Sequence, residues 1–132
     1  MADDVLAHAR LYLTLGFAVL PVHFPYERDG RRQCSCARED CGQPAKHPFG
    51  RLVSNGVKDA STDLETVTRW FTSTAFNIGI ATGGASGIFV LDIDPRHGGD
   101  EALAALEAEH GPLPSTWRFL TGGGGEHILF RH

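Results

Sequence analysis

The segment from Ile88 to Asp94 is the strongest predicted β-strand of the chain and constrains its fold and chemistry most. Its β-branched and aromatic residues favour an extended backbone. Side chains alternate across a strand, so Asp92 and Asp94 share one face while Leu91 and Ile93 point into the opposite layer. Pro95 then ends the strand, because proline has no backbone N–H for the sheet. We therefore expect both carboxylates at an accessible strand end.

This aspartate pair predicts a site for a divalent metal ion. Two carboxylates roughly 7 Å apart along a strand repel each other unless a cation lies between them. Oxygen ligands without nitrogen or sulfur suit Mg²⁺ or Mn²⁺. Two alternatives stay open. Both carboxylates can be solvated in an acidic turn, or Asp92 can be a nucleophile as in haloacid-dehalogenase-type phosphatases, although Arg96 stands where those usually carry Thr or Val.

A glycine run between two predicted strands is a candidate phosphate-binding turn. Strands are predicted at 117–121 and 127–131, joined by Gly122–Gly125 as a hairpin. Backbone N–H groups without neighbouring side chains allow close approach of a phosphate, here at Gly123, Gly124 and Gly125. His127 and Arg131 lie on one strand face and can add donors and positive charge. A flexible hairpin with a surface histidine is the alternative, and the P-loop pattern is absent.

All three cysteines of the chain lie in one segment, about 23–55, that has no hydrophobic periodicity. A loop of this length needs its own organiser. The ligand set Cys34, Cys36, Cys41 and His47 suits a tetrahedral, structural Zn²⁺ site, with His23 as an alternative fourth ligand. Free thiols in a mobile loop are the other possibility. The same segment is the most basic of the chain and can contact nucleic acid or simply be solvated, with residues Arg28, Arg31, Arg32, Arg38, Lys46 and Arg51.

The remaining sequence predicts one α+β domain over residues 1–132. Helices are expected at 3–15, from a Thr62–Glu65 capping box through Phe71, and from an Asp100 cap to Gly111, with further strands at 17–22 and 77–81. This order favours one mixed or antiparallel sheet with flanking helices. The net charge of −4 excludes a general basic DNA-binding surface. Without a signal peptide or an apolar run of membrane-spanning length, we expect a cytoplasmic protein.

Six motifs in this order resemble the N-terminal part of a bifunctional DNA primase/polymerase (prim-pol) domain of the archaeo-eukaryotic primase superfamily. The resemblance covers essentially the whole chain. The motifs are Gly16–Val22, the cysteine cluster running into Lys46-His47-Pro48, Gly56–Ala60, Asn77–Gly83, Val90–Pro95 and Thr121–His127.

The resemblance implies a primase-like, RRM-related core and template-directed nucleotidyl transfer with two divalent metals. Asp92 and Asp94 would bind these metals, and His127 would contact the phosphates of the incoming nucleotide, with Gly125 where many members have Ser. The family's third metal carboxylate would lie beyond this chain, so we expect a C-terminally truncated domain with an incomplete site. Implied partners are a DNA template and primer, nucleoside triphosphates and a helicase, in plasmid or phage replication. A metal-dependent phosphate-ester hydrolase and a non-catalytic zinc module that binds nucleic acid are the alternatives.

Overall fold

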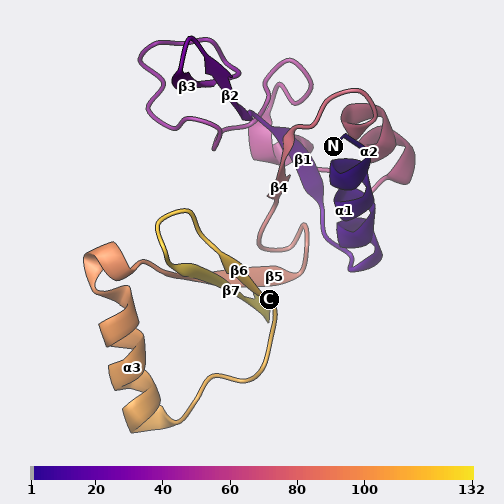
Figure 1. The fold of residues 1–132 in the computed structure, drawn as a ribbon. Helices are drawn as coiled ribbons and strands as arrows, with labels where there is room; N and C mark the ends of the chain where they lie inside the picture. Colours follow the sequence, from indigo (N-terminus) through magenta and orange to yellow (C-terminus); the bar gives the residue numbers. More distant parts are fainter. Residues whose placement is uncertain (1) are drawn as a thin grey trace. The chain divides into compact units, whose positions relative to one another are not determined.

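Each α-helix is followed by two or three short strands along residues 2–132, which the computed structural model describes (Figure 1). The described residues contain three α-helices and seven strands, and the strands form three small antiparallel sheets. The predicted α+β class is confirmed, but the strands form three sheets rather than one. The chain divides into two compact units, Met1–Ala81 (unit 1) and Thr82–His132 (unit 2).

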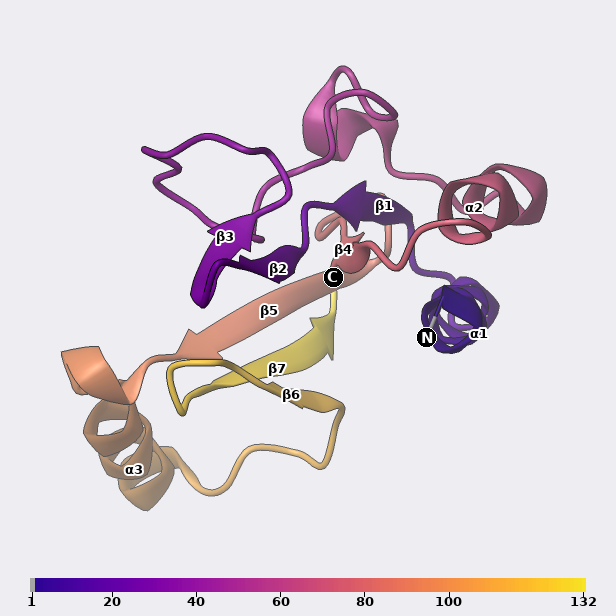
Figure 2. The same ribbon diagram turned by 45° about the horizontal axis from the view of Figure 1, so that its top comes forward.

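Unit 1 is built around two helices and a two-stranded sheet. Helices α1 (Ala2–Thr14) and α2 (Leu64–Phe71) lie side by side next to β1 (Val19–Val22), which pairs antiparallel with β4 (Asn77–Ile80) (Figures 1 and 2). Apolar residues recur at helical spacing and meet in one buried cluster. Its buried members are Ala9, Val19, Val67, Phe71 and Phe76.

A hairpin lies inside the segment that was expected to lack regular structure. Strand β2 (Pro25–Arg28) pairs with β3 (Arg31–Cys34) across the turn Asp29-Gly30, whose φ values are +52° and +72°. An Asp-Gly pair with positive φ at both positions is the preferred two-residue hairpin turn. The expectation was wrong here because the strands are mostly polar and exposed, so they show no apolar alternation. Asp29-Gly30 was the usable signal.

Unit 2 is a three-stranded sheet with one helix. Its strand order is β5-β7-β6, from β5 (Ile88–Ile93), β7 (Glu126–Arg131) and β6 (Arg118–Leu120). The β6–β7 pair confirms the predicted hairpin, and the register places Asp92 opposite His127. A 3₁₀ turn η2 (Pro95–His97) leads into α3 (Gly99–His110). Helix α3 packs beside Ile93, which lies on the face opposite to Asp92.

Two helix starts differ by one or two residues from the sequence prediction. Asp63, not Thr62, is the N-cap of α2, because its carboxylate accepts a hydrogen bond from the N–H of Thr66 at 2.8 Å. Gly98, not Asp100, is the N-cap of α3, and its left-handed backbone makes the bend after η2. Gly111 ends α3 as predicted. No helix formed by residues 2–132 is both long enough and apolar enough to cross a membrane.

Candidate functional site

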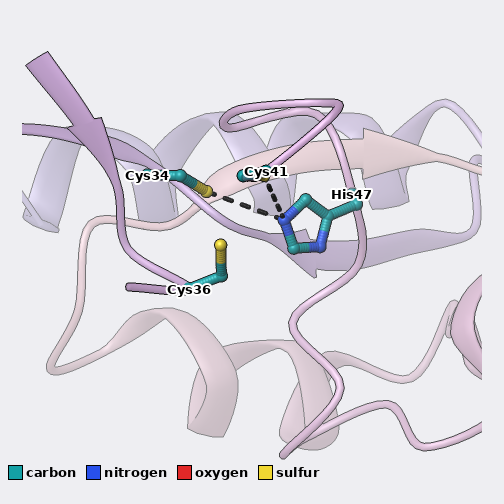
Figure 3. A group of neighbouring side chains, drawn as sticks. All are labelled: Cys34, Cys36, Cys41 and His47. Carbon is teal, nitrogen blue, oxygen red and sulfur yellow. Dashed lines mark hydrogen bonds between the residues drawn. The ribbon is translucent and has the colours of Figure 1, made fainter. Parts of the chain in front are cut away.

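The four predicted zinc ligands come together at the end of β3. Figure 3 shows the side chains of Cys34, Cys36, Cys41 and His47 converging from β3 and the following loop. One potential ligand atom from each residue lies within 4.8 Å of all the others. The Nε2 atom of His47 lies 3.6 Å from Sγ of Cys34 and 3.5 Å from Sγ of Cys41.

These distances fit a tetrahedral zinc ion. With Zn–S bonds of about 2.3 Å and Zn–N bonds of about 2.0 Å, the edge that joins a sulfur to a nitrogen is about 3.5 Å long. Both measured edges agree with this length. Three thiols and one imidazole also form a complete four-ligand shell, which is typical of structural zinc. The cluster can therefore hold zinc, with no ligand position left for a substrate.

His23 lies beside this cluster but outside the group of side chains placed to share a metal ion. Its Nδ1 atom makes a 2.7 Å hydrogen bond with the hydroxyl of Ser35, and its ring packs on that of His47 with a centroid distance of 4.3 Å. Its backbone N–H donates to the carbonyl of His47 at 3.0 Å. Burial and the neighbouring His47 both lower the pKa of His23, which favours the neutral ring. Of the two alternatives for the fourth ligand, the geometry favours His47.

The cysteine thiols have unequal tendencies to ionise. Burial works against ionisation of Cys34, but hydrogen bonds from the backbone of Ala45 and Cys36 outweigh it and lower the pKa to about 6. Burial raises the pKa of Cys41, and the hydrogen bonds and charge that it shares with Cys36 and Cys34 raise it further. Zinc binds thiolates, and at neutral pH Cys34 is already a thiolate. Cys41 must release a proton before it can bind the metal.

The second candidate site lies at the end of β5 in unit 2. Because Asp92 pairs with His127, both side chains project from the same face of the sheet. The Nε2 atom of His127 lies 3.6 Å from Oδ1 of Asp92, and both side chains are about half exposed or more, at 47% and 66%. Phe119 of β6 is the next residue across the sheet from His127. The predicted aspartate and histidine are thus adjacent and open to solvent.

The carboxylate of Asp94 is held by the two residues that follow Pro95. Its Oδ1 accepts hydrogen bonds from the backbone N–H and Nε of Arg96, and its Oδ2 accepts one from Nη2, all at 3.0 Å. Nδ1 of His97 also lies 3.0 Å from Oδ2. The guanidinium of Arg96, followed by His97, holds the pKa of Asp94 far below its usual range. Asp94 is therefore ionised and already paired with positive charge.

The glycine turn packs closely against the residues that end β5. A Cβ atom at Gly123 would lie 2.8 Å from Cζ of Arg96, so the guanidinium rests against the backbone of Gly123. A Cβ at Gly125 would overlap the carbonyl oxygen of Ile93, so this backbone has no room for a serine. Arg131 shares the face of Asp92 and His127 but pairs with Ile88 at the other end of the strand.

The structure thus groups some predicted residues and separates others. Within residues 2–132, the cysteine cluster is the one group of three or more His, Cys, Asp or Glu residues placed to share a metal ion. Asp92, Asp94 and His127 lie near one another without forming such a group. Sequence reasoning missed Arg96 and His97 as partners of Asp94. Arg96 and His97, two basic residues that follow the acidic pair after Pro95, were the available signal.

Comparison with known proteins shows the family. Residues 9–132 match the family described as the N-terminal domain of bifunctional DNA primase/polymerase. The match covers most of the chain, so the chain belongs to this family and the predicted resemblance is confirmed. The family supports a DNA primase/polymerase type of function in general, with a DNA template and nucleotides as substrates. No curated protein matches the chain. No solved structure matches it either.

Proposed function

We propose that the end of β5 is the nucleotidyl-transfer site of a DNA primase/polymerase, at which a primer is made or extended on a template. The observation that carries this proposal is the pairing of Asp92 with His127 on one open face of the sheet, next to the glycine turn that leads into β7. At this spacing the carboxylate can bind a metal ion that carries a triphosphate, while the imidazole contacts the phosphates of the same triphosphate. Family membership supplies the substrate class.

The donor chemistry of this strand end fits Mg²⁺ or Mn²⁺. Asp92 and Asp94 offer hard carboxylate oxygens, and Asp94 already attracts a cation in the form of Arg96. These two side chains would hold the metal. Bound there, a divalent ion would offset the negative charge that develops on the phosphates during transfer. Other ligands would complete the coordination shell of the metal ion, and the two aspartates would place that ion at the end of β5.

Other residues of unit 2 would position the nucleotide. His127, with 47% of its side chain exposed, can donate from Nε2 to a phosphate oxygen when its partner Asp92 binds a metal. The N–H of Gly123 belongs to a turn with few side chains, which suits a triphosphate. The N–H groups of Gly124 and Gly125 donate instead to the carbonyl and the hydroxyl of Thr121, both at 3.1 Å. Arg131 lies at the far end of the strand and would act on more distant charge, such as the template backbone.

Unit 1 would contribute a zinc-ordered, basic segment. Zinc in the cysteine cluster would fix the loop that follows the β2–β3 hairpin, and the exposed arginines of this hairpin would contact the DNA backbone. The same proposal includes a primase-like, RRM-related arrangement and a single catalytic domain over residues 1–132. It also includes two catalytic metals, a helicase partner and a cytoplasmic location. Their support is the family match and the order of the motifs.

The test is incorporation of nucleotides by the complete protein on a primed template, with Mn²⁺ or Mg²⁺. Asp92→Asn and Asp94→Asn should each reduce incorporation at least about a hundredfold, because a metal ligand is lost. Asp100→Asn, an exposed carboxylate in α3, is the matched control and should retain activity.

Three outcomes would contradict the proposal. Incorporation that survives the double change at Asp92 and Asp94 would remove this site from the reaction. A trapped phosphoenzyme at Asp92 without any incorporation would instead favour a phosphate-ester hydrolase. Stoichiometric zinc with DNA binding but no incorporation, indifferent to both aspartates, would favour a non-catalytic zinc module.

A further inference from the structure

Arg96 holds Asp94 more completely than a surface ion pair requires. Three hydrogen bonds of 3.0 Å join it to the carboxylate, one from its backbone and two from its guanidinium. The two guanidinium bonds reach different carboxylate oxygens, which is the bidentate geometry that arginine makes with carboxylates. Both oxygens of Asp94 are therefore engaged by one cation.

The glycine turn fixes where this cation lies. Cζ, Nε and Nη2 of Arg96 would all lie within 2.8–3.0 Å of a Cβ at Gly123, so only glycine permits the guanidinium to rest there. The charge of Asp92 acts on Arg96 as well, although less strongly than that of Asp94. Arg96 is consequently a cation between the glycine turn and the aspartate pair.

We infer that Arg96 is an internal counter-ion of Asp94, which neutralises the carboxylate before a divalent cation binds and competes with that cation for it. The inference rests on the proposed function, in which Asp94 is a metal ligand. Asp92 near the end of β5 and Asp94 directly after it are two carboxylates close together in the chain, and they need positive charge nearby. An ionised carboxylate offers about four lone-pair sites, and here Arg96 uses three of them while Nδ1 of His97 lies 3.0 Å from Oδ2. A metal ion must therefore displace one of these partners, and Arg96 holds the most sites.

A purely structural role for Arg96 predicts an opposite effect on metal binding. If Arg96 only holds Asp94 in a productive rotamer, its removal disorders a ligand and weakens the binding of metal. If Arg96 competes with the metal, its removal frees the carboxylate and strengthens binding. The direction of the change in metal affinity therefore separates the two roles.

The chain offers a charge-preserving variant for this test. Gly123→Ala places a methyl group where the guanidinium lies, and Arg96 can yield because the obstructed atoms are the far end of a flexible side chain. Gly123 does not have the positive φ that would strain an alanine. Gly122→Ala is the matched control, because nothing lies within 4 Å of a Cβ at Gly122 and its φ is also ordinary.

The experiment is titration of the zinc-loaded protein with Mn²⁺ alone, without nucleotide, following free Mn²⁺ by electron paramagnetic resonance. Arg96→Gln and Gly123→Ala should each lower the Mn²⁺ dissociation constant by about three- to tenfold, the range expected when one well-placed ion pair is lost. Gly122→Ala should leave it unchanged. In an Asp94→Asn background, Arg96→Gln should no longer change it.

Unchanged or weaker Mn²⁺ binding in Arg96→Gln and Gly123→Ala, with an unchanged melting temperature, would overturn the inference. It would leave the proposed function intact if Asp92→Asn still abolishes incorporation. Conversely, tighter Mn²⁺ binding that depends on Asp94 would support the counter-ion even if nucleotide incorporation were absent. A tightening that persists in the Asp94→Asn background would assign the effect to general charge and would also overturn the inference.

Discussion

His47 is the residue whose removal most directly tests the zinc centre. Its Nε2 atom is the nitrogen that faces two of the cysteine sulfurs. His47→Ala leaves three thiols and should reduce zinc from about one equivalent to well below one half in protein purified without chelator, because structural zinc needs four ligands. Metal analysis of the purified protein measures this content.

An exposed histidine elsewhere in unit 1 provides the control for this change. His8 lies on α1, and its Nδ1 is engaged with the carbonyl of Asp4, away from the cysteines. His8→Ala should therefore retain full zinc. Equal zinc content in wild-type protein and His47→Ala would contradict the ligand set, and loss of zinc in both variants would point to general unfolding.

Zinc affinity should depend on pH more steeply below about 6 than above it. The pKa of Cys34 is about 6 in the metal-free protein, so above that pH zinc meets a thiolate. As the pH falls through this value, zinc must displace one more proton, which adds a factor of roughly ten in affinity per pH unit. Competition with a chromophoric chelator from pH 5.5 to 7.5 measures the slope. A slope that does not change near pH 6 would contradict the assignment.

At the scale of elements, helix α2 carries a large share of the core of unit 1. Phe71, at its last turn, is fully buried and packs edge to face on Phe76 with centroids 6.3 Å apart. Phe71→Ala should lower the free energy of unfolding by about 3–5 kcal/mol, because the ring leaves a cavity that the helix cannot close. Urea denaturation followed by circular dichroism measures the loss.

The same helix supplies a matched comparison. Leu64 is its first residue and is 57% exposed, so Leu64→Ala should change the unfolding free energy by no more than about 0.5 kcal/mol. Similar losses in both variants would mean that α2 is not packed through Phe71 as the structure shows.

The hairpin of β2 and β3 shows how a short element can be missed in sequence. Its residues are polar because most of its side chains face solvent, and the burial pattern gives no alternation to detect. Its closing turn nevertheless follows a local rule, since Asp-Gly favours positive φ at both positions. Turn chemistry was thus more informative here than hydrophobic periodicity.

At the scale of the whole molecule, the charge is unevenly distributed. The net charge is −4, yet arginines are concentrated in the β2–β3 hairpin and the loop that follows it. If this segment contacts DNA, Arg31→Gln combined with Arg32→Gln should reduce the slope of log affinity against log salt by about 2, because two phosphate contacts are lost. Fluorescence anisotropy with a labelled primer–template at several salt concentrations measures the slope.

The control for the DNA experiment is an arginine outside the hairpin. Arg10 lies on α1, where Nη2 contacts the hydroxyl of Thr68. Arg10→Gln should leave the slope unchanged. A slope that is the same for wild type and the hairpin variant would exclude these arginines from DNA binding.

Much of the element order was predictable from the sequence because its signals are local. The periodicity of α1 and α2, the apolar strand β5, the Gly111 stop and the glycine hairpin all lie within short windows. Cap positions were less accurate, since Thr62, Asp63 and Asp100 all have suitable side chains and only backbone geometry selects among candidates. The division of the strands into three sheets could not be read locally, because it depends on pairings between distant segments.

The sequence by itself grouped Cys34, Cys36, Cys41 and His47 as a candidate zinc site and predicted that Asp92 and Asp94 share a strand face. Both follow from short-range spacing, in a loop and along one strand. Only the tertiary structure decided that His127 lies opposite Asp92, that Arg96 occupies Asp94 and that Gly125 has no room for a side chain. These facts depend on strand register and on backbone approach between β5 and the later glycine turn. Contacts of this kind have no fixed sequence spacing, so they appear only once the chain is folded.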